Sequence, residues 1–268
     1  MERYDIGTGN KGQCIVLNIT VFHGPHEERD GQEGFILSKL FSSLGFTTTL
    51  VAGDVPADRV IQEMKRITDW ITDADSLLVV CLMSHGERGS IISSDETKVE
   101  LQEIIEIFRN KNCPALKGKP RLFFIEACQE DVGKGTEKEE KEADDNDEDD
   151  EEDDDDEEEG CNATWDYKCD LPADFLLSFG TPPGYVCWWR EDKGSPYISA
   201  LVRALHKCTD EADNGGQRGA DITPLLTMVG SEVGLQVDLT DAESERIMKQ
   251  MPCYVSTLTK RLFLPKED

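Results

Sequence analysis

Two stretches of the chain decide its fold: SLLVVCLMSHG (76–86) and RLFFIEACQ (121–129). Each begins with a short apolar run that is typical of a strand buried on both faces of a sheet. The first run ends in Ser84, His85 and Gly86, and the second ends in Glu126, Ala127, Cys128 and Gln129. Because ligands of open parallel sheets gather outside the carboxyl ends of the strands, we expect the chemistry at these two ends.

Outward from these stretches, apolar strand-like runs alternate with amphipathic helical patterns. Further strands are predicted at 14–20, 46–51 and 173–181, with a last one at 253–264. Helices are predicted at 35–45, 56–71 (with Asp54 as a possible cap), 99–110, about 197–208, and after Asp221. This alternation predicts an α/β domain with about six mostly parallel strands and helices on both faces.

An acidic tract interrupts the domain. Residues 137–159 hold 19 acids against two lysines, a local net charge of −17 that leaves −11 of the total −28 for the rest of the chain. Such a tract repels itself and buries no apolar surface, so we expect a disordered insertion. The predicted organisation is a short segment (1–11), a first part of the domain (12–131), the acidic linker (132–170) and a second part (171–265).

Composition excludes several functions. The acidic chain offers no basic surface for nucleic acid, and its apolar runs are too short to cross a membrane. Nine cysteines without CxxC pairs disfavour a secreted disulfide scaffold or a zinc site, so we expect reduced thiols, a cytoplasmic location and neither metal nor cofactor.

Cys128 and His85 form the candidate catalytic pair. A thiol is mostly protonated at neutral pH, and a nearby imidazole can take its proton and later protonate a leaving amine. The backbone N–H groups of Gly86 and Cys128 could bind the oxyanion that forms. Alone, each side chain has a simpler explanation, because cysteine is often a packing residue. The other histidines lie in a polar loop (His23, His26) or in a predicted helix (His206).

At these residues the sequence resembles the caspase family. The family pairs Ser-His-Gly with a later Gln-Ala-Cys-x-Gly, the histidine lying roughly 50 residues upstream. Here the two motifs are Ser84-His85-Gly86 and Glu126-Ala127-Cys128-Gln129-Glu130, with 43 residues between His85 and Cys128. Other landmarks occur in the family's order: 12–18, Arg29-Asp30-Gly31, 117–120, Ala173-Asp174-Phe175-Leu176, Pro183-Gly184-Tyr185 and Met251-Pro252-Cys253.

The resemblance implies an endopeptidase that cleaves after aspartate, whose carboxylate two arginines and a glutamine hold. Arg29 matches the first arginine, whereas Glu126 replaces the glutamine. When the segment is aligned with the family without a gap, Trp189 takes the position of the second arginine. A shift of the alignment by one residue would place Arg190 there instead. Two consequences stay open: Arg29 and Glu126 pair and the pocket accepts another residue, or Arg190 dominates and aspartate cleavage survives at reduced efficiency.

The neighbouring residues Cys187 and Trp188 are also expected to bind substrate. Trp188 and Trp189 could form an aromatic wall for substrate residues farther from the cut, or they could be core packing.

The resemblance also implies a zymogen of the short-prodomain executioner type. Candidate processing sites for an upstream activating protease are Asp131, Asp166 and Asp170, in or beside the acidic linker. The last predicted strand would lie at the sheet edge, where a second copy could pair with it to form a homodimer. Protein substrates are the expected partners, with a role in apoptosis-like proteolysis.

Two other functions compete with an active protease. One is a weak or inactive homologue that regulates an active caspase by dimerisation, which a missing histidine or cysteine would favour; both are present. The other is an interaction protein whose acidic tract is the functional part. Deleting 137–159 would abolish its activity and spare a protease.

Overall fold

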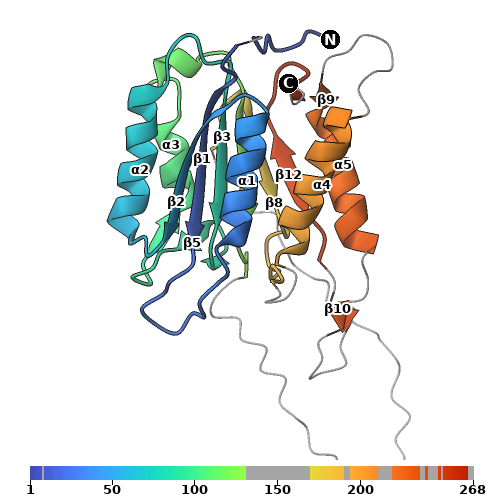
Figure 1. Cartoon of the computed structure of the whole chain (residues 1–268). Coiled ribbons are helices and arrows are strands. Elements are labelled where there is room, and N and C mark those ends of the chain that lie inside the picture. The colour runs from blue at the N-terminus through green and yellow to red at the C-terminus, as the bar shows by residue number, and fades with distance from the viewer. Residues whose placement is uncertain are drawn as a thin grey trace, which may run out of the picture.

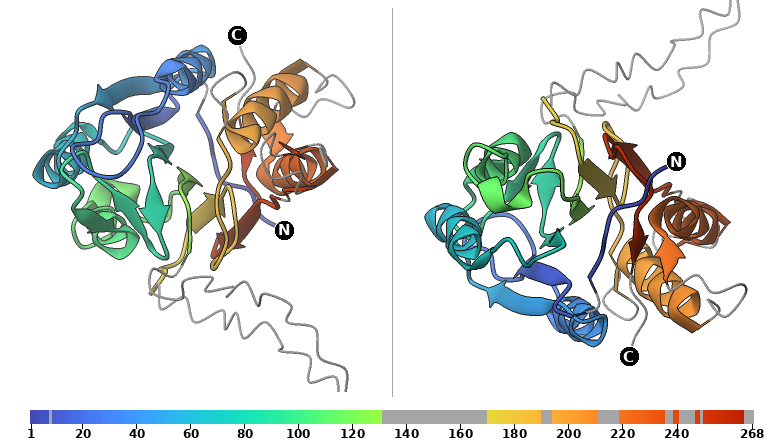
Figure 2. Two further views of the ribbon diagram at one scale, coloured as in Figure 1. Left: turned by 90° about the horizontal axis from the view of Figure 1, so that it is seen from below. Right: turned by 90° about the horizontal axis from the view of Figure 1, so that it is seen from above.

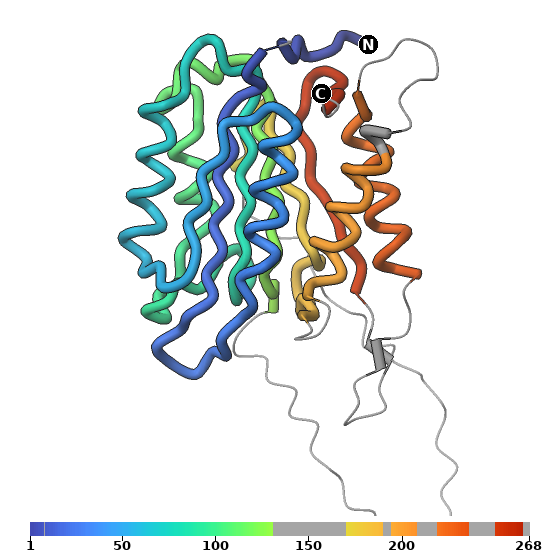
Figure 3. The backbone as a smooth tube through the Cα atoms, in the orientation of Figure 1, coloured from blue at the N-terminus to red at the C-terminus, as the bar shows by residue number. Residues whose placement is uncertain are grey.

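The computed structural model describes residues 1–7, 9–130, 170–189, 194–210, 219–235, 239–240, 247–248 and 250–264. Figure 3 traces the backbone and shows that the segments before and after the acidic tract lie side by side. Strands from both segments hydrogen-bond within one sheet. The prediction of one domain built from two segments agrees with this arrangement, and the linker prediction (132–170) falls almost entirely outside the described residues.

A six-stranded sheet forms the centre of the molecule. Its order is β12-β8-β7-β3-β1-β2. The strands are β1 (Gly12–Ile19), β2 (Thr47–Gly53), β3 (Leu77–Met83), β7 (Arg121–Glu126), β8 (Phe175–Phe179) and β12 (Cys253–Ser256). All neighbours are parallel except β12, which runs antiparallel to β8 at one edge. The predicted mostly parallel sheet is confirmed.

Helices cover both faces of this sheet (Figures 1 and 2). One face carries α2 (Ala57–Trp70) and α3 (Leu101–Ile107), and the other carries α1 (Gln32–Ser43), α4 (Pro196–Asp210) and α5 (Ile222–Leu235). Alternate residues of each strand therefore enter different cores. In β1, for example, Ile15 and Leu17 pack with the α2 and α3 side, while Val16 packs with α1, α4 and α5.

Smaller elements complete the fold. A three-stranded antiparallel sheet follows β3 and comprises β4 (Gly86–Glu87), β5 (Ser90–Ile92) and β6 (Lys98–Glu100). Two short pairs, β9 (Ala220–Asp221) with β13 (Phe263–Leu264) and β10 (Leu239–Thr240) with β11 (Ile247–Met248), and a 3-10 turn, η1 (Pro114–Leu116), make up the rest. No described helix combines the length and the apolar character that a membrane crossing requires.

Three local predictions were wrong. The last strand is not continuous over 253–264, because the chain turns after β12. There Thr259 and Tyr4 both donate a hydrogen bond to Asp174 Oδ1, each at 2.6 Å. Asp54 does not cap α2: it pairs with His23 at 3.1 Å.

Asp95 takes the position at the start of α2 instead, because its Oδ1 accepts a hydrogen bond from Ala57 N at 3.3 Å. The third error concerns the predicted helix over 99–110. Lys98–Glu100 is strand β6, and helix α3 begins only at Leu101.

Candidate active site

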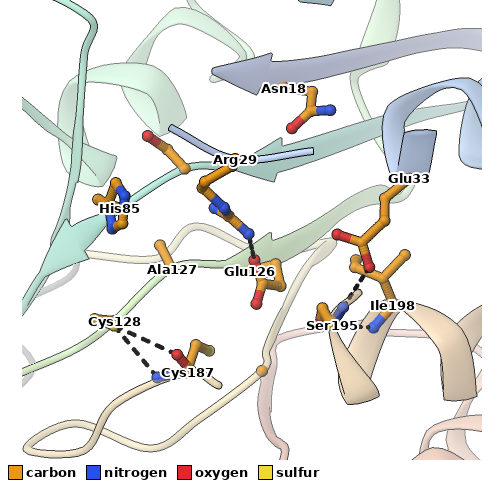
Figure 4. A network of polar contacts seen from close by, with 12 residues as sticks. Asn18, Arg29, Glu33, His85, Glu126, Ala127, Cys128, Cys187, Ser195 and Ile198 are labelled. Atoms are coloured by element: carbon orange, nitrogen blue, oxygen red, sulfur yellow. Dashed lines mark hydrogen bonds and ion pairs between the residues drawn. The ribbon is translucent and has the colours of Figure 1, made fainter. Parts of the chain in front are cut away.

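The two strand ends singled out in the sequence lie next to each other in the sheet. Strands β3 and β7 are neighbours and end in register, with Met83 opposite Glu126. The ladder continues one bond further, from Ser84 N to Glu126 O at 3.1 Å. His85 and Cys128 each follow two residues beyond the last paired position, so both emerge at the same sheet edge (Figure 4). The two strands are neighbours, which is the condition under which His85 and Cys128 can face each other.

The imidazole of His85 is oriented by a backbone carbonyl. Its Nε2 lies 2.8 Å from Glu27 O, and a carbonyl can only accept, so Nε2 carries a hydrogen. In the neutral ring the free lone pair is then on Nδ1. Phe22 packs edge-on against this ring with centroids 4.7 Å apart, and His26 lies 4.8 Å away. Burial is the main reason that the pKa of His85 is lowered, which favours the neutral ring.

His26, which the sequence places in a polar loop, packs beside His85. Its Nδ1 contacts Glu96 Oε2, and Glu96 adopts a left-handed backbone conformation with φ of 62°. The Glu96 side chain lies over Gly24, where an added Cβ would come within 2.4 Å of it. Nothing in the spacing of these residues relates them to His85, because the loop and the β5–β6 turn meet only in the folded chain.

The thiol of Cys128 contacts the backbone of Cys187. Its Sγ accepts a hydrogen bond from Cys187 N at 3.4 Å and donates one to Cys187 O at 3.7 Å (Figure 4). Burial raises the pKa of the Cys128 thiol, and the Cys187 N–H opposes that shift. Over the described part of the chain, no hydrogen bond joins Cys128 to His85. In this conformation Cys128 is therefore a neutral thiol held by the Cys187 segment.

Further hydrogen bonds hold this segment beside Cys128. Gln129 N donates to Tyr185 O at 2.9 Å, and Gly184 N donates to Gln129 O at 2.7 Å. The amide of Gln250 joins the same segment, accepting from Trp188 N at 3.0 Å and donating to Gly180 O at 2.8 Å. The segment from Gly180 to Trp188 is thus fixed at several points around Cys128.

Gly86 lies where no other residue fits without movement. A Cβ there would come within 2.7 Å of Ala127 Cβ and 2.8 Å of both Cys128 O and Ser90 O. Two of these contacts are backbone oxygens, which cannot rotate away. The backbone after His85 therefore packs directly against the backbone of Cys128.

Arg29 and Glu126 form a buried ion pair. Arg29 Nη2 contacts Glu126 Oε2, and the two side chains are only 6% and 1% exposed. The pairing of these two residues, one of the alternatives that the sequence left open, is present. The second oxygen, Glu126 Oε1, is buried and has no hydrogen-bond partner. The pocket predicted from Arg29 thus holds a cation that is already neutralised.

Glu33, in the first turn of α1, is a second carboxyl in this pocket. Ser195 N donates to its Oε1 at 2.6 Å (Figure 4). Burial first, and the neighbouring charge of Glu126 next, raise the pKa of Glu33 to about 7. Glu33 was not among the predicted site residues, because an acid in the first turn of a helix is already explained by the helix dipole.

The other predicted substrate-binding residues lie on the segment after β8. Cys187, Trp188 and Trp189 are half-buried, and neither tryptophan belongs to the two hydrophobic cores of the described residues. Trp189 Nε1 is buried without a hydrogen-bond partner. Burial, followed by Glu126 and Cys128, raises the pKa of the Cys187 thiol well above its usual value. Arg190 lies outside the described residues, so the choice between Trp189 and Arg190 stays open.

Among the candidate processing sites, Asp131 and Asp166 also lie outside the described residues. Asp170 is exposed, and its Oδ2 accepts from Arg109 Nη2 at 2.7 Å. The described residues contain no cluster of three or more histidine, cysteine or acidic side chains suited to a metal ion.

Comparison with known proteins identifies the family. A model of the caspase domain matches residues 11–263. The chain is 30% identical to Caspase-1 of Drosophila melanogaster, covering 97% of this chain and 75% of that protein, and 30% identical to Caspase-7 of Gallus gallus, covering 97% and 79%. The crystal structure of Caspase-1 from Spodoptera frugiperda matches with a TM-score of 0.77 at 27% identity, covering 100% of this chain and 95% of that one. The chain therefore belongs to the caspase family of cysteine-type endopeptidases.

Proposed function

We propose that this chain is an active cysteine endopeptidase in which Cys128 is the nucleophile and His85 the general acid and base. The observation that supports this most is the register of β3 and β7, which end at Met83 and Glu126 and project the two side chains from one sheet edge. Family membership supports a peptidase that cleaves after aspartate in apoptosis-like roles.

The proposed reaction proceeds through an acyl-enzyme. The Cys128 thiol gives its proton to Nδ1 of His85 as sulfur attacks the substrate carbonyl carbon and forms a C–S bond. The peptide C–N bond then breaks, and His85 returns the proton to the leaving amine. Water hydrolyses the thioester and regenerates the thiol. Because the pKa of Cys128 is raised and that of His85 is lowered, the resting pair is neutral and the proton moves during attack.

Gly86 supports the oxyanion in this proposal. Its backbone N–H and that of Cys128 lie on adjacent strand extensions, and the close packing of Gly86 against Cys128 O fixes their separation. Two N–H donors aimed at one oxygen stabilise the tetrahedral intermediate.

We propose that the described conformation is the zymogen form. The Cys128 thiol is occupied by the backbone of Cys187, and Gln129 is bonded to Gly184 and Tyr185. Attack on a substrate requires these contacts to open. An upstream protease that cuts in or beside the acidic linker, at Asp131, Asp166 or the exposed Asp170, would release the segment after β8 to rearrange.

The proposed specificity is aspartate at reduced efficiency. Arg29 supplies the expected cation, but Glu126 neutralises it and places a carboxylate where a substrate carboxylate would enter. Cys187, Trp188, Trp189 and Arg190 are proposed to line the rest of the substrate groove. Their segment is adjacent to the nucleophile through the Cys187 contacts.

The proposed partners are protein substrates and a second copy of the chain, in the cytoplasm. Strand β12 lies at the sheet edge, and its Tyr254 and Val255 are 39% and 42% exposed. An unpaired edge with apolar side chains is suited to pairing with another copy.

One set of contacts favours a second function. The Cys187 contacts and the Arg29–Glu126 pair both oppose substrate binding, as would suit a weak or inactive homologue that regulates an active caspase by dimerisation. The two functions differ in one observable, which is cleavage that depends on Cys128.

The test is a peptide-library profile of the processed chain beside Cys128→Ala, with Cys113→Ala as the matched control. Cys113 precedes η1 and lies at the opposite end of the sheet. We expect cleavage to fall at least about 1,000-fold in Cys128→Ala, since the nucleophile supplies the covalent step, and to persist in the control. A folded, processed dimer without Cys128-dependent cleavage would leave the regulatory function as the better account.

A further inference from the structure

The pocket that contains Arg29 and Glu126 carries two kinds of hydrogen-bonding group. Arg29 Nη2 contacts Glu126 Oε2, the only hydrogen bond of the guanidinium within the described residues. A guanidinium has five N–H donors, so donors remain after this contact. Glu126 Oε1 is buried and lacks a donor. The Arg29–Glu126 pair thus offers spare donors and one open acceptor.

An open acceptor in this position indicates the chemistry of its ligand. Buried polar side-chain atoms in native proteins nearly always have a partner, so a buried atom without one can take a water molecule or a group of a ligand. Glu126 is two residues before Cys128 on the same strand extension, and Arg29 is two residues after Glu27, whose carbonyl orients His85. A side chain that reaches this pair would therefore belong to the substrate residue at the cleaved bond.

A primary carboxamide matches both groups. Its NH₂ donates and its oxygen accepts within one planar unit, so it can bond Glu126 Oε1 and an Arg29 N–H together. A carboxylate would direct lone pairs at Glu126 Oε1 and add a charge to a pair that is already neutral. Asparagine has the same side-chain length as the aspartate that the proposed function assigns to this pocket.

We propose that this pocket prefers asparagine over aspartate as the residue whose carbonyl Cys128 attacks. The inference rests on the proposed function, and the covalent steps are the same: the C–S bond forms, the C–N bond breaks, and the proton passes through His85 to the amine. A second substrate class is added: an amide side chain at the cleaved bond is preferred, and aspartate is still cleaved, at the reduced efficiency proposed above.

Glu33 makes the preference depend on pH. Its carboxyl is faced by Arg29 and Asp30 from the loop before α1, by Glu126 from β7, and by the backbone N–H of Ser195. With its pKa at about 7, Glu33 is ionised above that pH and adds a negative charge beside the ion pair. A substrate carboxylate is then disfavoured further. The preference for asparagine therefore declines as the pH falls through about 7.

The experiment compares two peptides that differ only in asparagine or aspartate at the cleaved bond. For the processed full-length chain at pH 8 we expect kcat/KM to favour the asparagine peptide by at least about tenfold. The Glu126→Gln variant can present an amide donor in place of the acceptor. The ratio of kcat/KM for the asparagine peptide to that for the aspartate peptide should then fall by about 100-fold relative to wild type, so that aspartate is preferred. The matched control is Glu232→Gln, at a half-buried glutamate of α5 that pairs with Arg203 of α4, and it should leave the ratio unchanged.

A second measurement keeps the pocket and the catalysis separate. Calorimetry with the uncleaving Cys128→Ala chain should show tighter binding of the asparagine peptide by a similar factor. An aspartate preference in both assays, unchanged in Glu126→Gln, would overturn the inference while Cys128-dependent cleavage still upheld the proposed function. If the asparagine peptide binds selectively but the processed wild type does not cleave it, the asparagine preference would be supported and the proposed peptidase function would be refuted.

Discussion

Strand β7 buries a charged side chain at each end, and the two side chains differ in how far their polar atoms are hydrogen-bonded. At the first end, Arg121 is fully buried, and each of its three guanidinium nitrogens donates a hydrogen bond. Its Nε donates to Phe108 O at 3.1 Å, its Nη1 to Lys119 O at 2.9 Å and its Nη2 to Asn110 Oδ1. The guanidinium also lies over the Phe175 ring, 4.9 Å from the centroid. Every group here has a partner from the chain itself.

At the other end, Glu126 is 1% exposed, and only one of its two carboxylate oxygens has a partner. One oxygen contacts Arg29, and the other has no partner. Burial alone therefore does not separate a structural charge from a functional one. What separates them is whether every polar atom of the side chain has a hydrogen-bond partner in the chain, because an unsatisfied buried atom costs free energy that a ligand can recover.

The largest effect on stability should come from Arg121→Met. The substitution leaves the backbone oxygens of Phe108 and Lys119 without this donor and removes the contact to the exposed Asn110, so we expect a loss of about 3 kcal/mol in the free energy of unfolding. Urea denaturation measures it. Arg203→Met, which removes an exposed arginine, is the control and should cost less than about 0.5 kcal/mol. A loss below about 1 kcal/mol for Arg121→Met would remove the contrast between the two ends.

The next effect is a pH dependence from Glu33. Its folded-state pKa of about 7 exceeds the usual 4.5, so the folded chain holds a proton that the unfolded chain has released between these values. The stabilising contribution is present below about pH 4.5 and is lost as the pH rises through 7, by about 2 to 3 kcal/mol.

Glu33→Gln tests this dependence, because the amide cannot ionise and its oxygen can still accept from Ser195 N. Relative to wild type, the variant should gain stability progressively from pH 4.5 to 8 in urea denaturation. The exposed Glu28→Gln should show no such trend. A difference that stays constant across this range would mean that Glu33 is ionised throughout.

The smallest effect on stability should come from Glu126→Gln, although the variant changes specificity most. Removing one partner of a buried ion pair usually costs several kcal/mol. Here Glu33 can serve as the counter-charge of Arg29, and its pKa should fall because the charge of Glu126 is gone. We expect less than about 1 kcal/mol in urea denaturation. A loss of 3 kcal/mol or more would place Glu126 with Arg121 as a structural charge.

The sheet and the candidate pair of Cys128 and His85 could be predicted because both follow from local patterns. The runs that became β3 and β7 are apolar and bounded by polar residues, and the sheet rule places their carboxyl ends together. The Arg29–Glu126 contact was foreseeable as an alternative once the family resemblance placed the two residues in one pocket.

The remaining site features depend on contacts between distant segments. The bond from Cys187 to Cys128, the approach of Glu33 to Ser195 and the packing of His26 on His85 join residues 59, 162 and 59 positions apart. No periodicity or spacing encodes such loop contacts. The break after β12 was missed for the same reason, since it depends on Tyr4 and Asp174 meeting Thr259.

Gln250 connects the edge strand β12 to the segment that contacts Cys128. Its amide holds Gly180 and Trp188, and only Met251 and Pro252 separate it from β12. If pairing at β12 and opening of the Cys187 segment both shift Gln250, the two equilibria are linked and must influence each other equally. A peptide bound at Cys128 would then change the dimer dissociation constant by the same factor by which dimerisation changes the affinity for that peptide.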